Sequence, residues 1–225
     1  ISFKVNSGET LAIVGPTGSG KTTITNLITK FYEYDKGEIL IDGVDINDIK
    51  LNSIRSRVGI ILQDVFLFAD TIFNNIALYN DQISLKDVQS AAKKLEIHEF
   101  ISSLPNGYNF NVSERGVTLS SGQRQLIAFL RVLVNNPDIL ILDEATSSID
   151  SYSEDLIKNA TKKITKGKTS IIIAHRLSTI ESADKIIYME NGVILEKGNH
   201  KELLKIEDGK YKKLHKEQLF MEELI

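Results

Sequence analysis

Hydrophobic residues in this chain gather in short continuous runs, and the first of them leads into a stretch with helical spacing. Residues 10–14 form this run, and apolar side chains between Lys21 and Phe31 then share one helical face. Residues 139–142 and 169–174 form two more continuous runs. Uninterrupted apolar strands are typical of a parallel sheet that is covered on both faces. The alternation of strands and helices therefore predicts an α/β fold with a mainly parallel sheet.

Two other sets of strands are expected to pair antiparallel. Residues 38–43 read as a strand that ends in an Asp-Gly turn, and residues 58–62 form a second apolar run. We expect both in an antiparallel β patch beside the main sheet. Residues 185–189 and 193–196 flank a Glu-Asn-Gly turn sequence, which predicts a hairpin.

The middle of the chain changes to helical spacing. Ser84 and Ser120 each stand just before such a stretch, where a serine side chain can cap a helix. The charged C-terminal residues show weak periodicity and predict an exposed helix. The expected divisions are an α/β core at 1–70 and 137–205, an inserted helical subdomain at 71–136, and a charged tail at 206–225.

Composition excludes several classes of protein. A chain of 225 residues with 42% hydrophobic content can bury the core of one large domain or two small ones. A formal net charge of -3, without a dense basic stripe, gives no electrostatic footprint for nucleic acid. The count of 0 cysteines excludes disulfides, and no apolar run approaches the roughly 18 residues of a membrane helix. Alternating Ile1, Phe3 and Val5 read as the inside of a strand, so we expect a fragment of a longer protein.

A glycine-rich segment lies between the first apolar run and its helix. It matches the phosphate-binding loop (P-loop) pattern G-x-x-x-x-G-K-[ST] in full. Its glycines can adopt positive φ, so that backbone N–H groups turn toward an anion at the positive end of a helix. Lys21 would reach the β- and γ-phosphates of a nucleoside triphosphate, and the Thr22 hydroxyl would ligate Mg²⁺. The expected phosphate-binding residues are Gly15, Pro16, Thr17, Gly18, Ser19, Gly20, Lys21, Thr22 and Thr23.

Two acids follow the apolar run at 139–142. Asp143 arrives at the carboxyl edge of the parallel sheet, where a P-loop enzyme places its Mg²⁺-linked carboxylate. Glu144 points to the other side of the chain, where it can polarise an attacking water as a general base. With the P-loop, this pair predicts a Mg²⁺-dependent nucleoside triphosphatase.

Further motifs follow the P-loop in a specific order. These are Leu119-Ser120-Ser121-Gly122-Gln123 before a helix, then Asp143-Glu144, then Ala174-His175-Arg176 after the next strand. In this order they resemble the ATP-binding cassette (ABC) family, and the similarity runs over nearly the whole chain. Three further details resemble the exporter branch of this family: Gln63, Phe66-Leu67-Phe68 and Ser113-Glu114-Arg115-Gly116.

The resemblance implies that two such domains share each ATP. Ser120, Gly122 and Gln123 would reach the γ-phosphate held by a second cassette, packed head to tail in a homo- or heterodimer. Gln63 would join Mg²⁺ or the attacking water. His175 would hydrogen-bond the γ-phosphate and help to hold the water and Glu144.

The resemblance also implies a membrane partner. Residues 66–68 and 114–116 would lie where helices of a transmembrane domain dock, although core packing and a polar loop remain an alternative for them. That domain would be fused upstream of Ile1. Asp150 matches a position that contacts the opposing cassette. The implied function is ATP binding and hydrolysis that power an exporter at the cytoplasmic side of a membrane.

The chain departs from the family pattern at three places. Ser121 stands where the signature usually has glycine, which adds a hydroxyl and restricts φ. Ser148-Ile149 replaces the usual Ala-Leu. The adenine-stacking aromatic belongs upstream of Ile1, and Phe3 is in the wrong register to replace it. Without this stacking contact, the binding free energy of this chain for ATP would be weaker by up to about 1 to 3 kcal/mol.

Three other functions stay open. A soluble ABC ATPase of DNA repair or chromosome structure would carry a long coiled coil where this chain has a compact helical block. A degenerate, regulatory cassette would bind ATP without turnover; Glu144, His175 and Gln63 argue against it, while Ser121 keeps it open. A P-loop GTPase would need an Asn-Lys-x-Asp motif, which this chain lacks.

Overall fold

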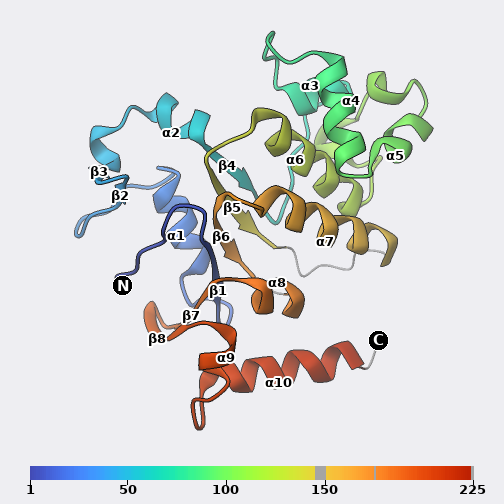
Figure 1. Cartoon of the computed structure of the whole chain (residues 1–225). Helices are drawn as coiled ribbons and strands as arrows, with labels where there is room; N and C mark the ends of the chain where they lie inside the picture. The colour runs from blue at the N-terminus through green and yellow to red at the C-terminus, as the bar shows by residue number, and fades with distance from the viewer. Residues whose placement is uncertain (145–150, 175, 224–225) are drawn as a thin grey trace. The chain divides into compact units, whose positions relative to one another are not determined.

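The computed structural model describes residues 1–144, 151–174 and 176–223. The chain forms two compact units. The first unit contains residues 1–60, 138–146 and 167–225, and the second contains residues 61–137 and 147–166. The first unit therefore holds the P-loop and the C-terminal end of the chain, and the second holds the helical middle (Figure 1).

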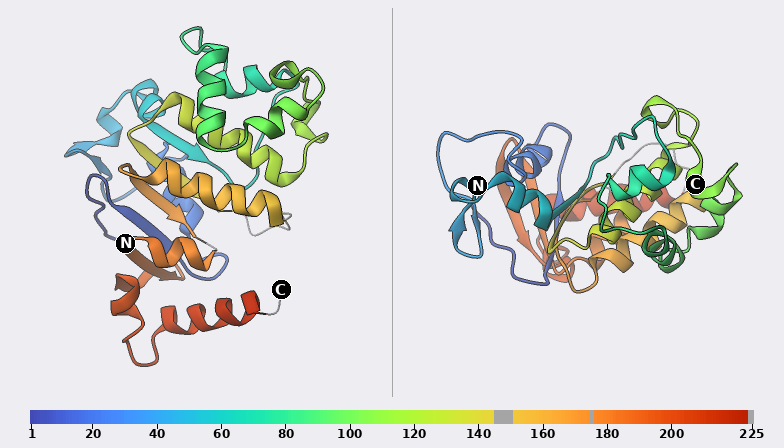
Figure 2. Two further views of the ribbon diagram at one scale, coloured as in Figure 1. Left: turned by 45° about the vertical axis from the view of Figure 1, so that its right-hand side comes forward. Right: turned by 90° about the horizontal axis from the view of Figure 1, so that it is seen from above.

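The first unit is built on a six-stranded sheet in the order β4-β5-β6-β1-β7-β8. β1 is parallel to both of its neighbours, with Leu11 opposite Ile171 of β6 and Lys185 of β7. β5 is parallel to β6, and β8 is antiparallel to β7 (Figure 2). The predicted α/β fold with a mainly parallel sheet is confirmed. The strands are β1 (Thr10–Val14), β4 (Val58–Ile61), β5 (Ile139–Asp143), β6 (Thr169–Ile173), β7 (Lys185–Glu190) and β8 (Val193–Gly198).

The central strands carry continuous apolar runs because both of their faces are covered. In β1, β5 and β6, every residue after the first is buried. Leu11 and Ile141 belong to one hydrophobic cluster with Ile24 of helix α1 (Lys21–Ile28). Burying each such side chain contributes about 1.5–3 kcal/mol to the free energy of folding. The P-loop therefore begins at a well-packed strand. The other helices of this unit are η1 (Ile46–Asp48), α2 (Leu51–Arg57), α8 (Leu177–Ser182), α9 (His200–Leu203) and α10 (Lys210–Glu223).

The apolar run at 58–62 lies elsewhere than expected. It forms β4, an edge strand of the main sheet beside β5, so its assignment to an antiparallel patch was wrong. The antiparallel pair is a separate small hairpin of β2 (Leu40–Ile41) and β3 (Val44–Asp45). The backbone N–H of Asp138 donates to the Arg57 carbonyl at 2.9 Å, which joins two distant segments at the start of β4 and β5. Apolar spacing identifies a buried strand but not its neighbour.

The predicted hairpin of β7 and β8 is confirmed. Glu190 pairs with Val193 across a two-residue turn. Asn191 and Gly192 have φ values of 51° and 74°, as a primed turn requires.

The second unit is helical. Its longest fully described helix, α6 (Ser121–Asn135), contacts α3 (Ile72–Ala77), α4 (Leu85–Lys94) and α7 (Ser151–Thr165). An amphipathic helix of this kind buries its apolar stripe against its neighbours. Among the described helices of the chain, none is long and apolar enough to cross a membrane. The shorter elements of this unit are α5 (His98–Ser103), η2 (Gly107–Asn109) and η3 (Glu114–Gly116).

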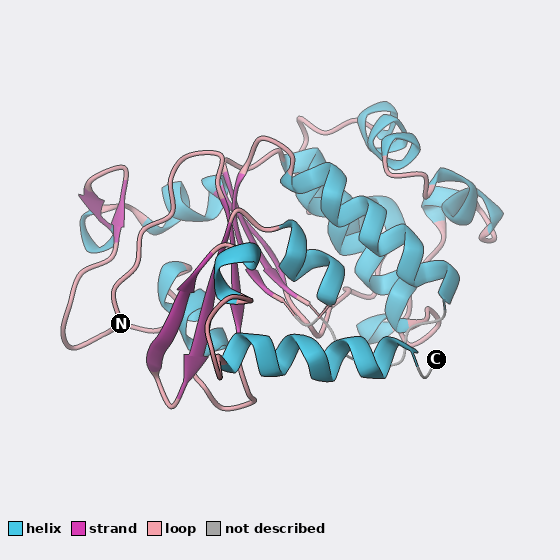
Figure 3. Cartoon of the chain, turned by 60° about the horizontal axis from the view of Figure 1, so that its bottom comes forward, coloured by secondary structure: helices cyan, strands magenta, loops and turns pink. Residues whose placement is uncertain are grey.

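The C-terminal helix begins in the core of the first unit. Tyr211 is fully buried, so the expectation of an exposed helix was wrong for its first turn. The backbone N–H groups of Lys210 and Tyr211 donate to the Glu196 carboxylate of β8 at 2.6 and 3.0 Å. α10 contacts both β8 and α8, and Figure 3 shows it extending from the hairpin. The negative charge of Glu196 at the helix start is favourable for the helix dipole.

Candidate functional site

The P-loop connects β1 to α1 in the first unit (Figure 1). Gly15, Gly18 and Gly20 have φ values of 141°, 79° and 98°, which confirms the predicted backbone conformation. A Cβ on Gly15 would lie 2.0 Å from the Met189 carbonyl oxygen of β7. Only glycine fits at this position, so the sheet itself shapes the start of the loop.

Lys21 spans the loop from the first turn of α1. Its Nζ donates to the carbonyl oxygens of Gly15 and Pro16 at 2.8 and 2.9 Å. Burial lowers the pKa of the Lys21 ammonium, and the nearby charge of Asp143 opposes this effect. A partly desolvated ammonium held over a loop of backbone N–H groups favours an anionic ligand.

Asp143 ends β5 beside the P-loop helix. The Thr22 hydroxyl donates to Asp143 Oδ2 at 3.3 Å, so the two expected Mg²⁺ ligands are neighbours. Burial raises the pKa of the Asp143 carboxyl, while the Thr22 hydroxyl and the Lys21 charge act in the opposite direction. A cation between these oxygens would relieve the cost of burying the carboxylate.

The donor set fits a phosphate and a magnesium ion. Ser19 is buried, and among the described residues its Oγ has no hydrogen-bond partner, which is unusual for a buried hydroxyl. A hydroxyl and a carboxylate are hard oxygen ligands of the type that Mg²⁺ binds in phosphate sites. These observations allow Thr22 and Asp143 to hold the metal and the loop to hold the phosphates.

Glu144 follows Asp143 and is held by a different segment. The Thr179 hydroxyl of α8 donates to Glu144 Oε1 at 2.7 Å, and the Arg176 backbone N–H donates to Oε2 at 3.3 Å. Both donors fix the direction of the carboxylate. Sequence reasoning did not identify Thr179, because nothing in the spacing of a threonine in a short helix relates it to an acid 35 residues earlier.

The signature segment caps α6 in the second unit. Ser120 Oγ accepts from the Gln123 backbone N–H at 3.2 Å, and Gln123 Oε1 accepts from the Ser120 N–H at 3.0 Å. This capping box confirms the predicted N-cap. Ser121 is the first residue of the helix and does not have positive φ, so replacing the usual glycine causes no left-handed strain. Gly122 lies in the same first turn.

Two other expected site segments belong to the second unit. Gln63 lies in an exposed bend just after β4. Phe66 and Phe68 are 50% and 48% exposed, with their ring centroids 5.2 Å apart edge to face, whereas Leu67 between them is buried. Core packing therefore explains Leu67 but not the two phenylalanines. His175, Asp150 and Ser148-Ile149 lie outside the described residues.

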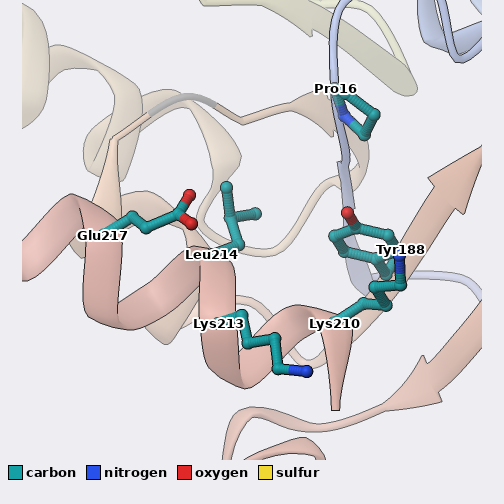
Figure 4. A pocket seen from close by; sticks show the side chains of 6 residues that line it. All are labelled: Pro16, Tyr188, Lys210, Lys213, Leu214 and Glu217. Atoms are coloured by element: carbon teal, nitrogen blue, oxygen red, sulfur yellow. The ribbon is translucent and has the colours of Figure 1, made fainter. Parts of the chain in front are cut away.

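A cavity of about 360 Å³ adjoins the P-loop on the side of the C-terminal helix. Pro16 and Tyr188 form one part of its lining, and the rest comes from α10 (Figure 4). Apart from Pro16 it contains no expected site residue. The lining from α10 is Lys210, Lys213, Leu214 and Glu217.

Known proteins are similar to this chain in sequence and in fold. The family model described as ABC transporter matches residues 1–147. YgaD, an ATP-binding/permease protein of Bacillus subtilis, is 51% identical over 214 residues, which are 95% of this chain and 37% of YgaD. An ATP-dependent lipid A-core flippase of Methylobacillus flagellatus is 49% identical over 221 residues, which are 97% of this chain and 37% of the flippase.

The solved structures include a bacterial Atm1-family ABC exporter with ATP bound. It matches this chain with a TM-score of 0.88 and 44% identity, covering 97% of this chain and 38% of the exporter. The chain thus spans little more than a third of the proteins that it matches. The family model covers more than half of the chain, and the residues that it matches include the P-loop and Asp143. The chain therefore belongs to the ABC transporter family.

Proposed function

We propose that this chain is the nucleotide-binding domain of an ABC exporter, which binds Mg²⁺-ATP and hydrolyses it. One observation carries the proposal: Lys21, Thr22 and Asp143 meet at the P-loop, and Glu144 stands next to them on the same strand end. ATP hydrolysis is general in the family to which the chain belongs. The exporter names of the relatives support transport as the process that hydrolysis powers.

The first step is phosphate binding by the loop. The backbone N–H groups of Gly15 and of residues 17–22, together with the Lys21 ammonium, would bind the phosphates, while Thr22 and Asp143 would hold Mg²⁺. The ion held by Thr22 and Asp143 would neutralise part of the negative charge of the phosphates. Catalysis by this chain then consists mainly of positioning and of charge stabilisation.

Glu144 is the proposed general base. A carboxylate has about four lone-pair sites, so Glu144 can accept a proton from water while Thr179 and Arg176 still hold it. We assign His175 to the γ-phosphate and the water, and Gln63 to Mg²⁺ or the water.

A second copy, or a related cassette, would complete the site. Ser120, Gly122 and Gln123 of one cassette would contact the γ-phosphate bound by the other. The hydroxyl of Ser120 accepts a bond within the capping box and can still donate its own hydrogen to a phosphate oxygen. The α6 N-terminus adds a favourable dipole for that anion.

The transmembrane region would be the second partner. The relatives are longer than this chain, and their names describe permeases and flippases. Exposed Phe66 and Phe68 offer an apolar docking surface for that region, with the domain on the cytoplasmic side of the membrane. The transported substrate would contact the other domains.

Glu144→Gln tests this function because it removes the base and keeps the shape of the side chain. We expect nucleotide binding to stay unchanged and phosphate release to fall by about a hundredfold or more. Lys21→Ala should instead weaken nucleotide binding itself. Glu207→Gln, at an exposed position, is the matched control and should behave as the parent. Parent-like ATP turnover by Glu144→Gln would show that Glu144 is not the base.

A further inference from the structure

Three helices of the first unit bring a glutamate and two histidines together, away from the P-loop. Glu181 comes from α8, His200 begins α9, and His215 lies on α10. One ligand atom from each residue lies within 4.8 Å of the other two. The Nε2 atom of His215 is 2.9 Å from Glu181 Oε1, and the Nε2 atom of His200 is 3.8 Å from the same oxygen. No residue of this cluster takes part in the nucleotide site described above.

A tyrosine orients one of the histidines. The Tyr211 hydroxyl lies 2.7 Å from His200 Nδ1, on the opposite side of the ring from Glu181. Tyr211 is fully buried, so this contact is fixed by the core. Histidines that ligate metals usually donate their second ring N–H to an oxygen, which leaves the other nitrogen as a ligand. Tyr211 provides such an oxygen for His200.

We propose that Glu181, His200 and His215 bind a divalent transition-metal ion of the zinc type. Two imidazole nitrogens and one carboxylate oxygen are a ligand set that zinc accepts, with water in the fourth position. Tetrahedral zinc with bonds of about 2.0–2.1 Å holds its ligand atoms about 3.3 Å apart, so small side-chain rotations suffice. The side chains of Glu181, His200 and His215 are 42%, 22% and 11% exposed, which lets an ion enter from solvent beside Glu181.

The ion would fasten α10 to α8. Glu181 is two residues after Thr179, the residue whose hydroxyl holds Glu144. Metal binding would therefore make the support of the proposed base more rigid; this consequence rests on the proposed function, whereas metal binding itself does not.

Zinc binding to the chelator-treated, 225-residue chain tests the site without any reference to ATP hydrolysis. We expect one saturable zinc ion per chain by titration calorimetry, and a higher unfolding temperature with zinc present. His200→Gln, His215→Gln and Glu181→Gln should each weaken binding by at least about tenfold, and Tyr211→Phe by about 10–100-fold.

His98→Gln is the matched control. His98 Nδ1 lies 2.8 Å from the Tyr108 hydroxyl, so this histidine has the same type of partner but belongs to the second unit. We expect its zinc affinity to equal that of the parent. Unfolding curves without zinc show which variants fold. If a histidine variant does not fold, the zinc affinity of Glu181→Gln, the most exposed of the three changes, tests the site instead. Absence of saturable binding by the parent, or an equal loss in His98→Gln, overturns the proposal.

Discussion

The fold partly buries two opposite charges at the P-loop, on Lys21 and Asp143, and burial disfavours the charged form of each. Burial lowers the pKa of Lys21 and raises the pKa of Asp143, and each charge partly offsets the burial of the other. Ligand-binding residues often have shifted pKa values of this kind, because a bound ligand supplies the opposite charge or hydrogen bond that burial has removed. The sequence identified both residues, whereas their burial comes from β1 and β5 lying in one sheet.

The raised pKa of Asp143 predicts how the stability of the ligand-free protein depends on pH. Between the ordinary value of 3.8 and the raised pKa, the folded state binds a proton that the unfolded state has lost. The contribution of Asp143 to stability is therefore complete below 3.8 and is lost as pH rises through the raised pKa. Asp143→Asn should remove this loss. Urea unfolding at a series of pH values should show the variant gaining stability relative to the parent as pH rises; parallel curves would contradict the assignment.

Thr179 is a residue that only the structure connects with the site. Thr179→Ala removes a donor to a buried carboxylate, so we expect the free energy of unfolding to fall by about 1–3 kcal/mol. ATP turnover should fall as well, because Glu144 loses part of its orientation. Thr179→Ser keeps the hydroxyl and should retain most of both properties. Equal unfolding free energies for the alanine and serine variants would show that the hydrogen bond contributes nothing.

At the scale of elements, two helices of the second unit begin in the same way. Ser84 caps α4 with Asp87, and Ser120 caps α6 with Gln123, each as a reciprocal capping box. The sequence predicted both helix starts, because a serine before an apolar periodic stretch is a local signal. Only Ser120 is also proposed to meet a phosphate, so Ser84 offers an internal control.

We predict that Ser84→Ala and Ser120→Ala destabilise the protein similarly and affect turnover differently. Each loses an N-cap, which costs about 0.5–2 kcal/mol in chemical denaturation. ATP turnover at saturating nucleotide, measured well below the unfolding transition, should fall by about tenfold in Ser120→Ala alone, because a phosphate donor is lost. The same turnover in both variants would leave Ser120 with a capping role only.

In the proposed dimer, each chain would contribute halves of two different nucleotide sites. The P-loop, Asp143 and Glu144 are in the first unit, and the Ser120 segment is in the second. In the proposed dimer, one chain contributes its P-loop and the other its capped helix start. Turnover per chain should therefore rise with protein concentration.

Mixing two inactive variants tests this arrangement. Lys21→Ala disables the P-loop half, whereas Ser120→Asp keeps a good N-cap but puts a negative charge against the γ-phosphate. A mixed dimer still contains one site with both halves intact, so the mixture should recover ATP turnover that neither variant shows alone. A mixture of Ser84→Ala with Lys21→Ala is the reference, because Ser84→Ala also loses an N-cap but leaves the Ser120 segment intact. A mixture as inactive as its components would contradict site completion in trans.

Local signals in the sequence determined a large part of this protein. The glycines of the P-loop, the buried strands before Gly15 and Asp143, and the cap at Ser120 depend on residues close together in the chain, so spacing alone reveals them. Only the tertiary structure decided the placement of β4 beside β5, the hydrogen bond from Thr179 to Glu144, and the meeting of Glu181 with His200 and His215. These features join segments that are distant in sequence, and which distant segments meet is set by burial of the whole core and not by any local pattern.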